Sequence, residues 1–89
     1  MAYHVEIEHA ASRSLIRIAR SDRRSAQRIT DAIKALAQDP RPAGAIKMSG
    51  VEAYRVRVGD FRIIYTILDT VLVVTVVKIG NLRDVYEDR

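Results

Sequence analysis

Hydrophobic and polar residues change their spacing several times along this chain, and each change predicts a new element of structure. Residues 3–7 alternate between apolar and polar, which is typical of a strand with one buried face. From residue 11 to about residue 20, and again from 26 to 37, apolar residues recur every three or four positions, as in amphipathic helices. Ser21-Asp22 can cap the second helix, and Pro40 ends it because the residue before a proline is disfavoured in helical φ/ψ.

The second half of the chain predicts strands. Residues 53–58 alternate in hydropathy, Gly59-Asp60 supplies a two-residue turn, and residues 61–67 return, so we expect a β-hairpin. A further turn at Asp69-Thr70 precedes residues 71–77, which are apolar on both faces. This last run predicts a central strand that lies between the preceding strand and the first strand.

The resulting order, β-α-α-β-β-β, predicts a single α+β domain over residues 1–89. We expect two N-terminal helices packed on a small, mostly antiparallel, four-stranded sheet. Residues 41–52 are predicted to form a loop that holds a short element at 46–50. The chain has no cysteine, so neither a disulfide nor a zinc–thiolate site can support the fold, and the apolar content of 48% must supply the core.

Three arginines are predicted to share one face of the hairpin. The two-residue turn pairs Val58 with Phe61 and Arg57 with Arg62, and Arg55 lies one period along on the same face. Guanidinium groups that oppose each other repel and destabilise the sheet, and the two strands contain no acidic side chain. We therefore predict that the three arginines bind an anion, and phosphate matches the guanidinium fork best. An exposed polar strand face without a ligand is the alternative.

The composition adds a preferred partner and a location. A net charge of +4 and an isoelectric point near 9.9 favour an anionic partner, with nucleic acid first. The longest apolar run, residues 71–77, is too short to span a bilayer, and the N-terminus lacks the uninterrupted apolar stretch of a signal peptide. We therefore expect a soluble cytoplasmic protein that does not bind a membrane.

Five further arginines recur at spacings of three and four in the helical region. They can form basic stripes that bind the backbone of ribosomal RNA, or a solvated helix face diluted by Asp22 and Asp31. The five are Arg13, Arg17, Arg20, Arg24 and Arg28.

Other chemistries have little support in the sequence. His4 and His9 lack a cysteine or a second histidine at a metal-ligand spacing, so we expect neither a metal nor a cofactor. Glu6 and Glu8 point the same way, but the chain has no additional loops that could build the sugar cleft of a glycosidase. The glycine-rich and serine motifs of nucleotide-binding and hydrolase sites are absent from the sequence.

Three segments resemble motifs of the RelE/ParE toxin superfamily. The sequence YRVRVGDFRIIY at residues 54–65 is similar to the family core, a YR-hydrophobic-R-hydrophobic-GDYR-hydrophobic-hydrophobic-Y pattern. The sequence KMSG at 47–50 resembles a lysine-apolar-x-glycine loop, and IGNLRDVY at 79–86 resembles the closing IGHRRDVY segment. The resemblance covers nearly the whole chain and is closer to the RelE branch than to the ParE branch.

This resemblance implies a type II toxin that cuts messenger RNA in the A site of the 70S ribosome. RelE-like cleavage is metal-free: the ribose 2′-hydroxyl attacks the adjacent phosphate and leaves a 2′,3′-cyclic phosphate and a 5′-hydroxyl end. By position, Arg55 and Arg57 match two basic residues of the second strand, Arg62 matches a phosphate-stabilising arginine, and Tyr86 matches a tyrosine that stacks on a base. The resemblance also implies a small cognate antitoxin whose acidic and apolar residues wrap the toxin.

The chain departs from the family pattern at two places. Arg55 and Arg57 stand where RelE carries lysines, and because arginine does not give up its proton we expect them to orient and stabilise charge. Asn81 and Leu82 stand where many relatives have histidine and arginine, which leaves Arg83 as the nearby cation. A ParE-like toxin that inhibits DNA gyrase and a non-catalytic RNA-binding homologue therefore remain alternatives.

Two of the residues implied by the motifs have simpler explanations. Tyr86 can cover the edge of the sheet rather than stack on a base. Lys47 lies in a glycine-bearing loop, where it can contact a phosphate or only water.

Overall fold

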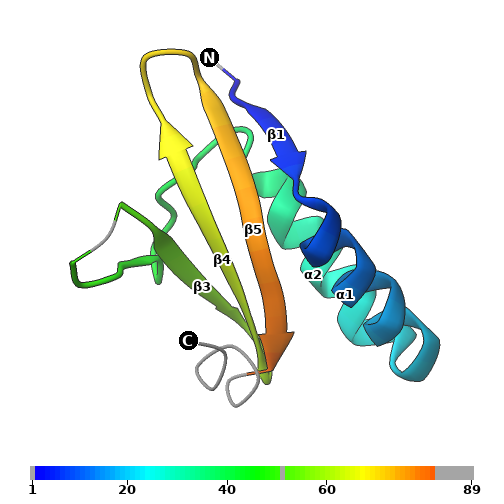
Figure 1. Cartoon of the computed structure of the whole chain (residues 1–89). Coiled ribbons are helices and arrows are strands. Elements are labelled where there is room, and N and C mark those ends of the chain that lie inside the picture. The colour runs from blue at the N-terminus through cyan, green and yellow to red at the C-terminus, as the bar shows by residue number, and fades with distance from the viewer. Residues whose placement is uncertain (1, 51, 82–89) are drawn as a thin grey trace.

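Two helices pack on one face of a five-stranded sheet in the computed structural model, which describes residues 2–50 and 52–81 (Figure 1). The strand order is β1-β5-β4-β3-β2, with β1 parallel to β5 and every other neighbouring pair antiparallel. The elements are β1 (His4–Ile7), α1 (His9–Ser21), α2 (Arg23–Ala35), β2 (Ile46–Lys47), β3 (Tyr54–Val58), β4 (Phe61–Leu68) and β5 (Val73–Asn81).

The predicted α+β class is confirmed, as is the position of the last strand between the first strand and the hairpin. The sheet has five strands rather than four, because Ile46–Lys47 in the predicted loop pairs with β3. The last strand also begins at Val73 rather than at residue 71, because residues 69–72 form the turn and Leu72 takes a positive φ of 56°. It then extends to Asn81, beyond the predicted end at residue 77.

Asp22 separates the two helices and caps the second, as the sequence predicted. Its carboxylate accepts hydrogen bonds from the backbone N–H of Ser25 at 3.0 Å and from the Ser25 hydroxyl at 2.6 Å. These two hydrogen bonds lower the pKa of Asp22 because they stabilise its charged form. No helix in the described part of the chain has the length and apolar character needed to cross a membrane.

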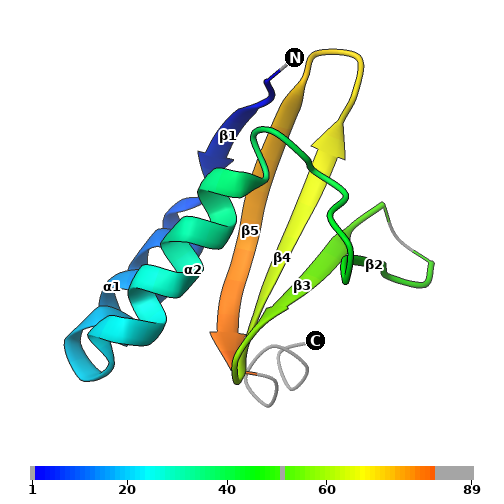
Figure 2. The same cartoon turned by 180° about the vertical axis from the view of Figure 1, so that it is seen from behind.

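The core lies between the helices and one face of the sheet (Figure 2). Side chains alternate between the two faces of a strand, so Ile63 and Tyr65 of β4 point toward the helices while Arg62 and Ile64 point the other way. The buried apolar residues of this core are Ala11, Ile29, Ile33, Leu36, Ile63, Tyr65, Val74, Val76 and Ile79.

A polar cluster joins the long loop after α2 to the end of the sheet that carries the β4–β5 turn. Arg41 donates two hydrogen bonds to Asp69, from Nη1 at 3.2 Å and from Nη2 at 2.9 Å. Tyr3 donates its hydroxyl to the same carboxylate at 2.7 Å, and Arg41 also lies over the ring of Tyr54 and donates to its hydroxyl at 3.1 Å. The cluster therefore ties the N-terminal segment, the loop, β3 and the β4–β5 turn together.

Tyr65 anchors the same loop from inside the core. The residue is fully buried, and its hydroxyl donates to the carbonyl of Pro40 at 2.8 Å. Burial, followed by the proximity of Tyr54, raises the pKa of Tyr65 to about 12, so the hydroxyl remains a donor at physiological pH.

The substitution Tyr65→Phe tests this anchor. It removes one buried hydrogen bond and leaves the Pro40 carbonyl without its donor, which is expected to lower the free energy of unfolding by about 1–2 kcal/mol. Urea denaturation followed by circular dichroism measures the change. A variant as stable as the wild type would show that the hydroxyl does not hold the loop.

The substitution Asp69→Asn tests the polar cluster through pH. Hydrogen bonds from Arg41 and Tyr3 lower the pKa of Asp69 in the folded protein. Ionised Asp69 therefore adds to the stability of the fold in full above the ordinary carboxyl pKa of about 4. That contribution is lost as the pH falls through the lower folded-state pKa. We expect Asp69→Asn to melt at a lower temperature than the wild type at pH 7 and the gap to narrow below about pH 4. A gap that stays constant down to pH 2 would contradict the cluster's role.

Candidate functional site

Arginines gather on the sheet face opposite the helices. The hairpin has the predicted register, with Arg57 opposite Arg62 and Val58 opposite Phe61. Cross-strand partners share a face, so Arg57 and Arg62 lie together, and Arg55 follows on the same face two residues away. Arg55, Arg57 and Arg62 are called the arginine face below.

Carboxylates of the described residues do not neutralise the charge of the hairpin pair. The ion pairs found there are His4–Glu6, Arg41–Asp69 and Lys47–Glu52, and none of them includes Arg57 or Arg62. Arg57 donates from Nε to the carbonyl of Gly59 at 2.9 Å, which is a neutral acceptor in its own turn. Arg57 and Arg62 therefore occupy directly opposed positions of the hairpin, and arginine side chains are positively charged at physiological pH.

A lysine that the sequence analysis did not identify lies on the same face. The pairing of β4 with β5 shifts between Ile64 and Tyr65: Tyr65 opposes Val76, whereas Ile64 opposes Lys78. One additional residue of β5, Val77, is thus left between the two pairs, which is a β-bulge. Without the bulge, Lys78 would point to the helix side like Val76. With it, Lys78 lies beside the arginine face.

The sequence contained only a weak signal for this lysine. The predicted strand ended at residue 77, so Lys78 was excluded from it, and strict alternation with Val74 and Val76 would have buried the lysine. A charged lysine at a position that strict alternation would bury was the one sign that the strand contains a bulge.

Lys47 is not brought to the arginine face. It opposes Tyr54 across the β2–β3 pair, and Tyr54 packs against the core on the helix side. Its Nζ lies 3.1 Å from a carboxylate oxygen of Glu52. Contact between Lys47 and a phosphate stays a prediction.

The five helical arginines are divided between the two helices, three on α1 and two on α2. Arg13, Arg17 and Arg20 line a common hollow on α1 together with Ile16. Arg28 instead reaches the hairpin turn, where its Nη1 lies 3.4 Å from the position that a Cβ on Gly59 would occupy. Arg28 therefore adjoins the turn that also binds Arg57.

The remaining helical arginine, Arg24, is exposed in the first turn of α2. Two predicted site residues, Arg83 and Tyr86, lie outside the described residues, as does Leu82. Their predicted roles are neither supported nor opposed by the structure.

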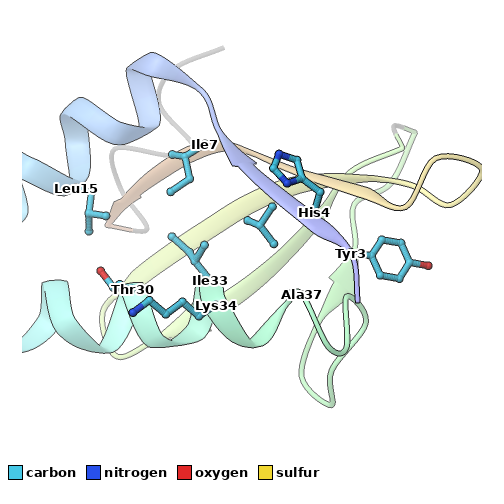
Figure 3. Close-up of a pocket in the computed structure, with 9 residues that line it drawn as sticks. Tyr3, His4, Ile7, Leu15, Thr30, Ile33, Lys34 and Ala37 are labelled. Carbon is cyan, nitrogen blue, oxygen red and sulfur yellow. The ribbon is translucent and has the colours of Figure 1, made fainter. Parts of the chain in front are cut away.

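An apolar groove lies between β1 and the helices (Figure 3). Its volume is about 380 Å³, and in Figure 3 Ile7 from β1 and Ile33 from α2 point toward each other across it. Ile7 is 40% exposed, and β1 is an edge strand whose only strand neighbour in the described sheet is β5. The lining residues are Tyr3, His4, Val5, Ile7, Leu15, Thr30, Ile33, Lys34 and Ala37.

Solved structures share this fold over nearly the whole chain. The archaeal RelE–RelB complex from Pyrococcus horikoshii contains a chain that matches with a TM-score of 0.79 and 25% identity, covering 91% of this chain and 96% of that one. The YoeB/ParE toxin from Agrobacterium tumefaciens matches with a TM-score of 0.77 and 16% identity, covering 88% and 96%. The isolated E. coli RelE toxin matches with a TM-score of 0.75 and 18% identity, covering 98% and 94%.

Sequence comparison identifies the family. The profile of the ParE toxin of the type II toxin–antitoxin system parDE matches residues 5–86. No curated protein gives a significant sequence match. The family match spans the helices, the groove and the arginine face, and it agrees with the superfamily resemblance of the three motifs. The chain therefore belongs to the ParE toxin family of type II toxin–antitoxin systems, within the RelE/ParE superfamily.

Proposed function

We propose that this toxin is a ribosome-dependent endoribonuclease that cuts messenger RNA in the A site without a metal ion. The observation that carries the proposal is the pairing of Arg57 with Arg62 on the sheet face opposite the helices. Opposed like charges destabilise a sheet, and a phosphate bound between them offsets that repulsion. RNA cleavage supplies such a group at the moment when its negative charge is largest.

The proposed reaction is an internal transfer at phosphorus. The ribose 2′-oxygen attacks the adjacent phosphate, and charge accumulates on the non-bridging oxygens before the 5′-oxygen leaves. In this proposal Arg62 and Arg57 stabilise that charge, because preorganised cations act most strongly where charge develops in the transition state. Arg55 extends the same surface along the RNA backbone, and Arg28 adds a cation beside the hairpin turn.

Inhibition of DNA gyrase is the second candidate function, because the profile that matches residues 5–86 is that of ParE. A gyrase inhibitor acts through protein–protein contacts and does not require a phosphate between Arg57 and Arg62. Messenger RNA cleavage and DNA supercoiling therefore separate the two candidates.

We also propose that the groove beside β1 binds an apolar segment of the cognate antitoxin. Solved relatives include a RelE–RelB complex, so related toxins form such assemblies. The groove is lined largely by apolar side chains, and the exposed edge of β1 can pair with an added strand. Lys34 at the groove and the net charge of +4 favour a segment that also carries acidic residues.

The substitution Arg62→Ala tests the nuclease proposal. It removes one of the two cations at the proposed phosphate, so we expect cleavage to fall at least a hundredfold while the fold is retained. Primer extension on transcripts after induction measures cleavage. Arg23→Ala, which removes an exposed arginine of α2 outside the arginine face, is the matched control and should cut like the wild type.

Two results would contradict the nuclease proposal. One is a folded Arg62→Ala variant that cuts at the wild-type rate. The other is a toxic wild type that leaves transcripts intact while it blocks supercoiling, which would favour gyrase inhibition.

A pair of isoleucine variants tests the groove. Ile7→Asp places a charge inside the groove, whereas Ile16→Asp places one at a 52% exposed position on α1 outside it. Burial of an isoleucine contributes about 1.5–3 kcal/mol, so Ile7→Asp should weaken antitoxin binding roughly 10- to 100-fold. Ile16→Asp should change it less than about twofold. Calorimetric titration with the antitoxin from the adjoining reading frame measures both, and equal affinities for the two variants would rule the groove out.

A further inference from the structure

The arginine face lacks a group that can exchange a proton. Breaking the bond from phosphorus to the 5′-oxygen requires a proton for the leaving oxygen. Arginine keeps its protons throughout the physiological range, so Arg55, Arg57 and Arg62 can stabilise charge but are poor proton donors. A lysine ammonium can donate a proton and recover it from water.

The β-bulge places one lysine in the row next to Arg57 and Arg62. Arg55, Ile64 and Lys78 form one row across β3, β4 and β5, and Arg57, Arg62 and Gly80 form the next row. Neighbouring strands are about 4.8 Å apart, so the Cα atoms of Lys78 and Arg55 lie roughly 10 Å apart on either side of Ile64. Gly80 contributes no side chain to the second row.

The bulge also explains how a lysine can reach this face from a strand of the core. Val76 and Ile79 are both buried against the helices although they are three positions apart, an odd spacing that regular alternation would put on opposite faces. The additional residue at Val77 lets both Val76 and Ile79 point toward the helices, and it turns Lys78 to the opposite face. Bulges next to active sites commonly re-aim a side chain in this way.

In the described part of the sheet, the other side chains on this face that can exchange a proton lie farther from Arg57 and Arg62 than Lys78 does. His4 and Glu6 also face this side, but they oppose Val73 and Thr75 toward the other end of β5, and they pair with each other at 3.4 Å. Among the described residues of β3, β4 and β5, Lys78 is the one side chain on this face that both carries a proton and can release it.

We propose that Lys78 is a catalytic residue that protonates the leaving 5′-oxygen, an inference that rests on the proposed ribonuclease function. The bond from the 2′-oxygen to phosphorus forms as the bond from phosphorus to the 5′-oxygen breaks. Lys78 Nζ gives its proton to the 5′-oxygen, which leaves as a 5′-hydroxyl. The proton of the 2′-hydroxyl passes to water, and Lys78 regains a proton from water.

The test replaces the leaving oxygen with sulfur. Ribosomes are programmed with a messenger RNA that carries either the natural phosphodiester or a single 5′-bridging phosphorothiolate in the A-site codon, and single-turnover cleavage is measured. A thiol loses its proton near pH 8.5, so a thiolate leaves without an acid. Lys78→Met is expected to cut the natural RNA about a hundredfold more slowly than the wild type does. On the sulfur RNA, its cleavage rate should lie within about threefold of the wild-type rate.

Two matched variants complete the experiment. Lys78→Arg keeps the charge but not the exchangeable proton, so it should show the same selective defect, and it serves in place of Lys78→Met if that variant does not fold. Arg62→Ala removes charge stabilisation that both substrates require, so it should be slow on both.

Each outcome has one meaning. Rescue of Lys78→Met or Lys78→Arg by sulfur supports the proposal. A Lys78 variant that cuts both RNAs at the wild-type rate, or one that is equally slow on both, overturns the role of Lys78 and leaves the nuclease function intact. A wild type that cuts neither RNA overturns the nuclease function itself.

Discussion

Electrostatic repulsion across one hairpin is the constraint on which the functional interpretation depends. The short turn at Gly59-Asp60 places Arg57 directly opposite Arg62, and the ion pairs among the described residues do not include either of them. Two like charges that oppose each other across a strand pair lower the free energy of unfolding by up to about 1 kcal/mol. A bound phosphate can recover this loss, and recovery is greatest when the phosphate gains charge during reaction.

The hydrophobic core and the arginine face share the same strands. Helix packing requires Ile63 and Tyr65 of β4 to point inward, so Arg62 and Ile64 must point outward. The same requirement on β5, where Val76 and Ile79 are both buried, produces the bulge that turns Lys78 outward. The position of the charged groups is thus a consequence of how the apolar side chains pack, and the site is carried by strands rather than by loops.

Local patterns predicted the parts of the structure that local chemistry determines. The turn residues set the hairpin register, and Asp22 capped a helix where a capping residue was expected. The bulge was not predicted, because it arises from packing between β5 and the helices, and the charge of Lys78 was the one weak sign of it in the sequence. The bond between Arg41 and Asp69 joins residues 28 positions apart, so no periodic pattern indicates it. The β2–β3 pairing was not predicted either, and it puts Lys47 opposite Tyr54, on the helix side of the sheet.

The stability of Arg62→Gln relative to the wild type tests the central claim most directly. Unfolding by urea is measured at one ionic strength, first in chloride and then with inorganic phosphate. If opposed guanidinium groups repel and a phosphate relieves them, the variant is more stable than the wild type in chloride by up to about 1 kcal/mol, and phosphate stabilises the wild type more. A variant that is less stable than the wild type in chloride, together with an equal response of both proteins to phosphate, would contradict the account.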